Sequence, residues 1–346
     1  MSESIPVSPS PGRRRAEGVS AVITAYNAAW CIERVLDSIF AQTLVPAEVL
    51  VADDGSTDDT IERIERRYGD AVRVLRLPHR GLTPSRIASV AAASGPWIAV
   101  VDADDTWLPD KIERQLAFLE RHPELRWLSS DGMIVAAEGV VGESWLAAYF
   151  TPIETRIGDL YPAMVQRCFA LVSSSMIHLD AYHAVGGYDA HIEYSQDYSL
   201  WLKLSARFPC GVMSDRLITY WTSPTQLSKR IEERYRDDMS LMERVAHGEY
   251  RKDAATQRLG REKVASYEFD LGVICLRSGR VKEGQAHLWR AVLGPGPLRR
   301  RAMALFGALT PRGALRGLMR SPWLKGAVHR SRRTNPMIPP PERSDP

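Results

Sequence analysis

Short apolar runs alternate with amphipathic helical segments through the N-terminal third of the chain, and this order constrains the fold most. The four runs fall at residues 19–23, 48–52, 72–77 and 97–102. Between the first two, Ile32, Leu36 and Ile39 recur at the spacing of one helix face. Strands that alternate with helices in this way form parallel sheets with right-handed crossovers. The sequence therefore predicts an α/β fold built on a mostly parallel, Rossmann-like sheet flanked by helices.

The fourth apolar run ends abruptly in three carboxylates, Asp102, Asp104 and Asp105. In an extended chain Asp102 and Asp104 point the same way, about 7 Å apart, and no Lys or Arg lies between them to offset the repulsion. Bound Mg²⁺ or Mn²⁺ would resolve this conflict, because both ions prefer carboxylate oxygens and bridge to phosphates. Open α/β sheets also bind ligands at the carboxyl ends of their strands. The alternative is a helix-capping acidic turn, with Asp105 ahead of a helix at 109–121.

Length and composition indicate a globular protein. With 346 residues, 45% of them hydrophobic and 25% charged, the chain has room for one large domain or two of ordinary size. It contains no apolar run of about 18 residues, so we expect no transmembrane helix. The cysteines are scattered without CxxC pairs or metal-type spacing, which favours a reduced, cytoplasmic protein.

We expect four segments along the chain. Residues 1–18 are rich in Ser, Pro and Arg and have no apolar core, so they are not a secretory signal and are predicted to be disordered. The α/β domain spans 19–228, a helical region spans 229–330, and a disordered tail spans 331–346. Within the helical region, residues 267–291 resemble one tetratricopeptide-like helical hairpin.

Charge is distributed unevenly between the body of the chain and its C-terminal part. Residues 284–346 hold 12 Lys and Arg against 2 Asp and Glu, a net +10, whereas the rest of the chain carries −7. Residues 298–328 mix these basic side chains with Leu, Met, Phe306 and Trp323, a pattern that suits an anionic membrane surface. The alternative is a solvated helical tail. We expect no nucleic-acid partner, because the basic stretch contains no recognition motif.

Five short segments occur in an order and spacing that are specific when taken together. They are Val22–Asn27, Val51–Asp58, Val101–Asp105, Gly186–Asp189 and Gln196–Trp201. Together they resemble the inverting family-2 glycosyltransferases of GT-A fold. The resemblance implies a GT-A domain, and the α-helical extension predicted C-terminal to it lies beyond the part of the chain that the resemblance covers. It also implies a metal-dependent, inverting hexosyltransferase that uses a nucleotide-diphosphate sugar, with UDP-sugar as the expected donor.

The resemblance assigns four residues to the nucleotide. The backbone around Thr24 and the ring of Tyr26 contact the base, and the Asp54 carboxylate accepts a hydrogen bond from the uracil imide. Arg86 lies near the base and phosphates, although the Asn that usually follows it is Ile87 here. The alternatives are that Tyr26 packs on its own helix and that Arg86 lies on a solvated helical face.

The resemblance assigns the divalent cation, Mn²⁺ or Mg²⁺, to two aspartates. Asp104 is the metal ligand, and Asp102 contributes to the ribose or to the metal shell. Relatives often carry a Tyr-Arg-x-His segment whose His approaches the metal or the diphosphate. Here the corresponding segment reads Tyr220-Trp221-Thr222-Ser223, so both the Arg and the His are missing.

Asp197 is the expected catalytic base. It stands at the head of the apolar stripe of a helix predicted at 195–208, where partial desolvation would favour proton transfer. The alternative is a helix N-terminal cap. The acidic residue that usually precedes this Asp is Gln196 here. Trp201 and Tyr188 are expected to line an acceptor subsite by stacking on sugar rings, with core packing as the alternative.

These features lead to one expected function and two competing ones. The expected enzyme transfers a sugar to a growing glycan or a lipid-linked acceptor in the cytoplasm, peripherally at the inner face of the membrane. One competitor is a sugar nucleotidyltransferase, which usually has a Gly-rich phosphate loop and a basic residue where this chain has Thr24–Asn27. The other is a non-catalytic binding or scaffold protein of the same fold, which the altered segments at 196 and 220–223 favour.

Overall fold

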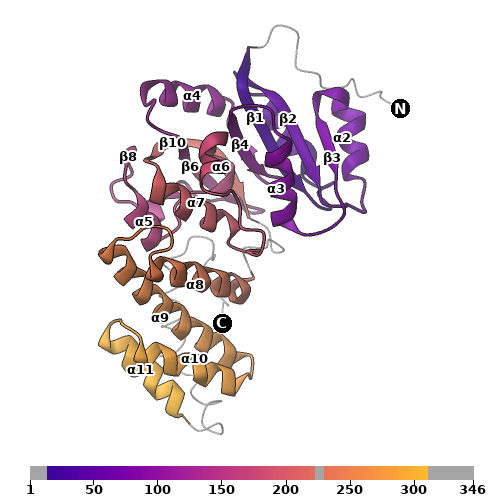
Figure 1. Cartoon of the computed structure of the whole chain (residues 1–346). Coiled ribbons are helices and arrows are strands. Elements are labelled where there is room, and N and C mark those ends of the chain that lie inside the picture. The colour runs from indigo at the N-terminus through magenta and orange to yellow at the C-terminus, as the bar shows by residue number, and fades with distance from the viewer. Residues whose placement is uncertain (1–13, 223–229, 311–346) are drawn as a thin grey trace. The chain divides into compact units, whose positions relative to one another are not determined.

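A mixed sheet of ten strands forms the centre of the first of two compact units, Met1–Ser223 and Pro224–Pro346 (Figure 1). The computed structural model describes residues 14–222 and 230–310. The strands are Arg15–Ala25 (β1), Val45–Asp53 (β2), Arg73–Arg76 (β3), Trp97–Asp102 (β4), Thr106–Trp107 (β5), Trp127–Ala136 (β6), Gly139–Gly142 (β7), Arg156–Gly158 (β8), Met176–His178 (β9) and Cys210–Trp221 (β10). They lie in the order β3-β2-β1-β4-β9-β6-β10-β5, with β7 beside β6 and β8 beside β10.

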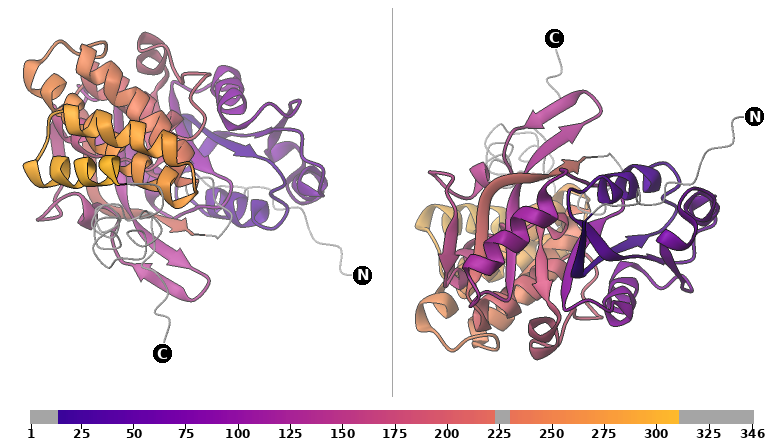
Figure 2. Two further views of the ribbon diagram at one scale, coloured as in Figure 1. Left: turned by 90° about the horizontal axis from the view of Figure 1, so that it is seen from below. Right: turned by 90° about the horizontal axis from the view of Figure 1, so that it is seen from above.

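Helices flank the strands of this sheet, and Figure 2 shows them on both sides of β1 and β2. The helices are Ile32–Phe40 (α1), Thr60–Tyr68 (α2), Leu82–Ala92 (α3), Lys111–Arg121 (α4), Tyr161–Gln166 (α5), Leu179–Ala184 (α6) and Gln196–Arg207 (α7). Single 3₁₀ turns occur at Gly69–Ala71, Leu146–Ala148 and Val172–Ser174. The pairs β1–β2, β1–β4 and β2–β3 are parallel, as the alternating pattern predicts, and the α/β class is confirmed.

The second half of the sheet is less regular than the first. β6 pairs parallel with β10, whereas β9 is antiparallel to both β4 and β6. The predicted disordered segment 1–18 is wrong at its end, because β1 begins at Arg15 and pairs there with Val45 of β2. Residues 1–13 lie outside the described part of the chain. The boundary expected at residue 228 falls within 223–229, which the structure does not describe.

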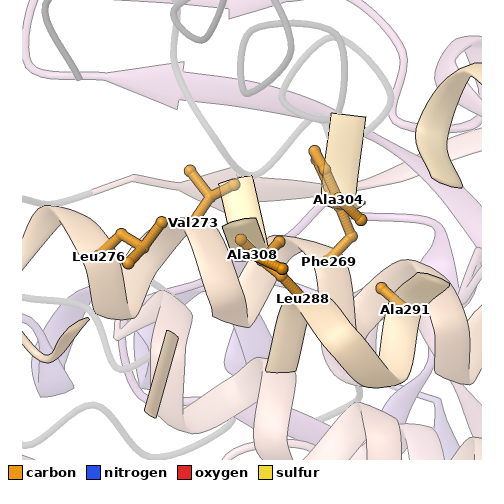
Figure 3. Close-up of a cluster of buried hydrophobic side chains, with 7 residues drawn as sticks. All are labelled: Phe269, Val273, Leu276, Leu288, Ala291, Ala304 and Ala308. Carbon is orange, nitrogen blue, oxygen red and sulfur yellow. The ribbon is translucent and has the colours of Figure 1, made fainter. Parts of the chain in front are cut away.

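The second unit consists of helices in its described part, as the charged helical pattern predicts. They are Ile231–His247 (α8), Ala254–Arg277 (α9), Val281–Leu293 (α10) and Leu298–Leu309 (α11). A buried apolar cluster joins the last three, as Figure 3 shows, and it consists of Phe269, Val273, Leu276, Leu288, Ala291, Ala304 and Ala308. Gly272 and Gly284 let α9 and α10 approach closely, because a Cβ on Gly284 would lie 2.9 Å from the Gly272 carbonyl oxygen. None of the helices in the described residues is long and apolar enough to cross a bilayer.

A fully buried lysine at the start of α4 links the stability of the first unit to pH. Lys111 donates a hydrogen bond from Nζ to Gln115 Oε1 at 2.8 Å, and Nζ lies 4.2 Å from the centroid of the Trp107 ring. Burial lowers the pKa of Lys111 to about 7. Between this pH and about 10.4 the unfolded chain keeps a proton on Lys111 that the folded protein has released. The free energy of unfolding should therefore rise with pH across that interval.

Lys111→Met should remove this pH dependence. We expect the stability difference between wild type and variant to change by a few kcal/mol in favour of the wild type between pH 7 and pH 10. Urea unfolding of both proteins across the interval measures this difference, and the other titrating groups cancel in it. Parallel pH profiles for the two proteins would contradict the assignment.

Candidate active site

The carboxyl ends of three parallel strands bring the first site residues together. Thr24 near the end of β1 is in register with Ala52 of β2 on one side and with Asp102 of β4 on the other. Adjacent strands lie about 4.8 Å apart, so Thr24 stands between the two aspartate-bearing strand ends. The sheet thus places Thr24, Asp54 and Asp102 along one edge.

Asp53 and Asp54 have separate structural roles at the end of β2. The Asp53 carboxylate accepts hydrogen bonds from the backbone N–H groups of Gly55 and Ser56 at 3.2 and 3.0 Å, and it also accepts one from the Ser56 hydroxyl. Gly55 has φ +78°, and a Cβ there would lie 2.9 Å from the backbone nitrogen of His79. A glycine is therefore needed both for the turn and for this close approach.

Asp54 holds the loop that precedes α3. Its carboxylate accepts backbone hydrogen bonds from Arg80 and Gly81, each at 3.0 Å, and a hydroxyl hydrogen bond from Ser85 at 2.7 Å. The carboxylate is almost completely buried. Most of its capacity to accept hydrogen bonds is therefore used within the protein itself.

An exposed aromatic pair lies beside Asp54. Tyr26 is 47% exposed, and its ring stacks on the His79 ring with the centroids 4.2 Å apart. His79 belongs to the loop after β3, so Tyr26 does not need its own helix as a packing partner. The sequence analysis missed His79, although a histidine between Pro78 and Gly81 at the end of a predicted strand was a usable signal.

Arg86 connects the end of β4 to the start of α7. Its guanidinium pairs with Asp102 and donates a hydrogen bond to Gln196 Oε1 at 2.8 Å. Burial acts to lower the pKa of Arg86, but the carboxylates of Asp102 and Asp197 help to outweigh it, so the pKa is raised. The alternative of a solvated helical face is wrong, because only 2% of Arg86 is exposed.

The expected geometry of the aspartates after β4 is also wrong. β4 ends at Asp102, and the chain then turns, with the Asp105 N–H donating to the Asp102 carbonyl at 3.1 Å. Alternation along a strand therefore does not apply to Asp104, which lies within the turn. Asp102 also has the basic partner that the sequence between the aspartates lacks, because Arg86 reaches it from α3.

Asp105 ties the end of β10 to this turn. Its carboxylate accepts hydrogen bonds from the Ser173 hydroxyl at 2.5 Å and from the Trp221 N–H at 3.0 Å. Burial, reinforced by the charges of Asp104 and Asp102, raises the pKa of Asp105. Helix capping by Asp105 is wrong, since α4 begins at Lys111 and its N-cap residue is Asp110.

At the end of β10, Trp221 stands where relatives often carry an arginine, and its ring packs against an arginine from α1. The Arg34 guanidinium from α1 lies 4.3 Å from the centroid of the Trp221 ring, and Arg34 donates to the Asp104 carbonyl at 2.8 Å. The sequence analysis missed Arg34, which it could not distinguish from other polar residues of an amphipathic helix. A guanidinium group is therefore present near Asp104.

Asp197 lies in the first turn of α7, as the sequence predicts. It is half-buried, and its Oδ1 accepts a hydrogen bond from the Tyr198 N–H at 2.8 Å. The N-cap residue of α7 is Ser195 rather than Asp197. The charge of Asp197 also helps to raise the pKa of Arg86, which is buried between Asp102 and Gln196.

The two expected acceptor-stacking residues are buried instead. Trp201 is fully buried and stacks on Trp127 with the ring centroids 5.3 Å apart. Tyr188 is 5% exposed and packs edge-on against Tyr182, and its burial raises the pKa of its hydroxyl. Neither ring offers a face to an acceptor sugar, so this expectation is wrong and the core-packing alternative is correct.

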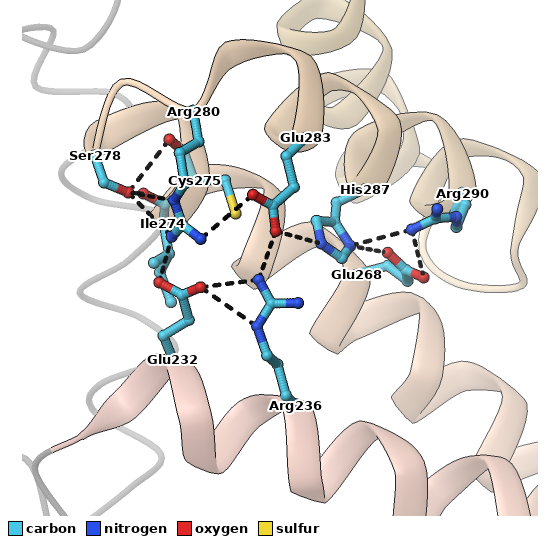
Figure 4. A network of polar contacts seen from close by, with 10 residues as sticks. All are labelled: Glu232, Arg236, Glu268, Ile274, Cys275, Ser278, Arg280, Glu283, His287 and Arg290. Carbon is cyan, nitrogen blue, oxygen red and sulfur yellow. Dashed lines mark hydrogen bonds and ion pairs between the residues drawn. The ribbon is translucent and has the colours of Figure 1, made fainter.

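A second cluster that could hold a metal lies in the helical unit. Among the described residues, Cys275, Glu283 and His287 bring their ligand atoms within 4.8 Å of one another, whereas Asp102, Asp104 and Asp105 do not form such a group. Figure 4 shows that two guanidinium groups already engage Glu283: Arg236 at 2.6 Å and Arg280 at 3.3 Å. These contacts make the cluster an ion network between helices rather than a metal site.

The first unit has an α/β fold of GT-A type, which the solved structures described below share. Residues 20–156 match the model of the family described as glycosyl transferase family 2.

The similar proteins support the fold and cover different shares of their own length. The chain is 34% identical over 189 residues to chondroitin synthase from Pasteurella multocida (strain Pm70), an alignment that covers 54% of this chain but only 19% of that protein. S. aureus TarS 1-349 in complex with UDP superposes with a TM-score of 0.59 at 16% identity, over 89% of this chain and 91% of that one. Mannosyltransferase PcManGT from Pyrobaculum calidifontis, in complex with GDP-Man and Mn²⁺, gives a TM-score of 0.56 at 16% identity, over 95% and 87%.

Proposed function

We propose that the first unit is a metal-dependent, inverting glycosyltransferase that transfers a sugar from a UDP-sugar to a hydroxyl of a glycan or a lipid-linked acceptor. One observation carries the proposal. The sheet edge at Thr24, Asp54 and Asp102 is linked through the buried Arg86 to the start of α7, where Asp197 stands. A donor site and a candidate base therefore belong to one connected arrangement.

The donor nucleotide is proposed to bind along the edge of the parallel strands. The base stacks on Tyr26, the backbone at Thr24 contacts it, and Asp54 accepts a hydrogen bond from its imide. An exposed aromatic face beside a buried carboxylate supports this placement. Arg86 serves the nucleotide by holding Asp102 in place, since its guanidinium is buried against that carboxylate.

Asp104 and Asp102 are proposed to hold Mn²⁺ or Mg²⁺. The residues fit such an ion in their chemistry, because hard cations of this kind take carboxylate oxygens and few protein ligands. When bound, the cation supplies Lewis-acid charge to the departing diphosphate. Arg34, beside Asp104, adds positive charge on the same side of the turn.

Asp197 is proposed to take the proton from the acceptor hydroxyl. That hydroxyl then attacks the anomeric carbon opposite the departing diphosphate, and the configuration inverts. The preceding residue, Gln196, accepts a hydrogen bond from Arg86 at 2.8 Å, and a carboxylate beside it is of the residue type that acts as a general base.

A nucleotide screen tests the donor site without a known acceptor. We expect UDP with Mn²⁺ to raise the melting temperature by several degrees at saturating concentration, because a ligand that binds only the folded state stabilises it by mass action. Parallel titrations with GDP, CDP and dTDP, each with and without Mn²⁺, identify the base. Unchanged melting temperatures with every nucleotide would refute the proposed donor site.

A non-catalytic scaffold protein is the second candidate. One observation favours it: the chain itself already engages the Asp54 carboxylate, through Arg80, Gly81 and Ser85. The same screen separates the candidates, since a scaffold would bind no nucleotide in a metal-dependent way.

We further propose that the helical unit holds the enzyme peripherally at the inner, cytoplasmic face of an anionic membrane. α11 carries three consecutive arginines, Arg299 to Arg301, together with exposed Leu298, Phe306 and Leu309. Each basic side chain near such a surface contributes roughly 1 kcal/mol, so a handful of them give reversible binding.

Removing residues 311–346 should weaken membrane binding without unfolding the helical unit. This truncation removes 8 Lys and Arg and keeps α11, whose Ala304 and Ala308 belong to the buried cluster. We expect the full chain to co-sediment with vesicles containing phosphatidylserine and the truncated chain to stay largely in the supernatant. Neutral phosphatidylcholine vesicles are the control, and equal sedimentation of both chains with anionic vesicles would refute the role of this segment.

A further inference from the structure

The His79 ring lies where the proposed function places a nucleobase. It stacks on the exposed Tyr26 ring with an interplanar angle of 18° and a centroid separation of 4.2 Å. This is a parallel stack of the kind that a base makes with an aromatic side chain. The face of Tyr26 that His79 covers is therefore not open to another ring at the same time.

A ring nitrogen of His79 contacts the Asp54 carboxylate, which is the group proposed to accept a hydrogen bond from the base. Nδ1 lies 2.8 Å from Asp54 Oδ2 and 3.0 Å from the Asp54 carbonyl oxygen. Both neighbouring atoms accept hydrogen bonds, so we assign the hydrogen of the ring to Nδ1. His79 thus combines a stacked aromatic face with a ring N–H directed at a carboxylate.

We propose that His79 is a built-in surrogate for the nucleobase, and that donor binding displaces its ring from Tyr26 and Asp54. The inference rests on the proposed donor site, and it also predicts which nucleobases that site accepts. A base that replaces His79 must present a ring N–H at the same place. Uracil and guanine carry such a hydrogen on N3 and N1, whereas cytosine and adenine present an acceptor there. Asp54 therefore selects for bases with such a ring N–H, namely uracil, thymine and guanine, and against cytosine and adenine.

The surroundings allow the ring to leave while the loop stays in place. The His79 side chain is 56% exposed, whereas its loop is held by main-chain hydrogen bonds from Arg80 and Gly81 to Asp54. Rotation about the side-chain bonds of His79 therefore exposes Tyr26 and frees one oxygen of Asp54 without unfolding the loop.

Calorimetric titration of UDP with Mn²⁺ tests the displacement. His79→Ala should bind UDP about tenfold more tightly than wild type, because neither the stack nor the hydrogen bond has to be broken first. His79→Phe, which keeps a ring for Tyr26 but has no N–H, should fall between the two. His183→Ala removes an exposed histidine from α6 of the same unit and should leave the affinity unchanged. CDP should bind at least about tenfold more weakly than UDP to every variant.

The outcomes distinguish failure of the proposed His79 displacement from failure of the proposed donor site. Equal UDP affinity of wild type and His79→Ala overturns the inference and leaves the donor site standing. Weaker binding of UDP by His79→Ala also overturns the inference, because His79 would then contact the bound base instead of being displaced by it. Absence of nucleotide binding by both proteins refutes the donor site along with the inference.

Nuclear magnetic resonance gives an independent measurement of the same event. The His79 ring protons should be shifted upfield by the Tyr26 ring in the free protein, and UDP should move them toward the positions of an exposed histidine. Unchanged His79 signals at saturating UDP would overturn the displacement, whatever the affinities of the variants.

Discussion

Asp197→Asn should lower turnover at least ~100-fold while the affinity for UDP stays within about twofold of wild type, because an amide cannot accept the proton of the acceptor hydroxyl. The local structure should survive the change. Asp197 Oδ1 accepts a hydrogen bond from the Tyr198 N–H at 2.8 Å, and the amide oxygen of Asn can accept the same bond. The measurements are the rate of UDP release from a UDP-sugar and the affinity for UDP by calorimetry.

A matched control separates the loss of a base from the loss of a charge. Asp180 lies in α6 of the same unit, and 90% of its side chain is exposed, so Asp180→Asn should keep full turnover. Near-normal turnover of Asp197→Asn would remove Asp197 as the base. A large loss of UDP affinity in that variant would instead assign its carboxylate to the donor.

Asp104→Ala should abolish the dependence of UDP binding on Mn²⁺. We expect UDP affinity with Mn²⁺ to fall to the level that the wild type shows with a chelator, because the proposed ion loses its principal protein ligand. Asp104 is a cleaner probe than Asp102, since removing Asp102 would leave the buried Arg86 without its partner and destabilise the fold.

The control for this experiment is Asp70→Ala, an exposed aspartate in the turn after α2. It changes the net charge of the unit by the same amount and should leave the effect of Mn²⁺ intact. UDP affinity of Asp104→Ala that still rises with Mn²⁺ to the wild-type level would refute the metal assignment.

The parallel half of the sheet could be predicted from sequence, whereas the other half could not. Strands β1, β2 and β4 are buried over most of their length and separated by amphipathic helices, so their apolar runs stand out locally. β10 has no such pattern: it passes from Cys210 through the polar stretch at 214–216 to Trp221. It is a strand because β6, about 80 residues earlier, lies beside it, and single-sequence patterns carry no record of such long-range pairing.

The site residues likewise fall into those that the sequence predicts and those that it does not. Asp197 and the strand-end positions of Thr24, Asp54 and Asp102 followed from element boundaries, which local patterns indicate well. The contacts of Arg86 and Asp105 did not follow, because each depends on a partner from a distant element. Trp201 illustrates the limit most clearly, since an aromatic residue on a helix face looks the same in sequence whether it meets Trp127 or a sugar.

The engagement of Asp54 by the loop before α3 decides which variants can be interpreted. A substitution at Asp54 releases Arg80, Gly81 and Ser85 together, so inactivity would report on the shape of the loop and on base recognition at once. Tyr26 and His79 are exposed, and the loop keeps its bonds from Arg80, Gly81 and Ser85 to Asp54 when either side chain is changed. Substitutions that tune nucleotide affinity should therefore be tolerated at these two positions, whereas a change at Asp54 also releases the loop.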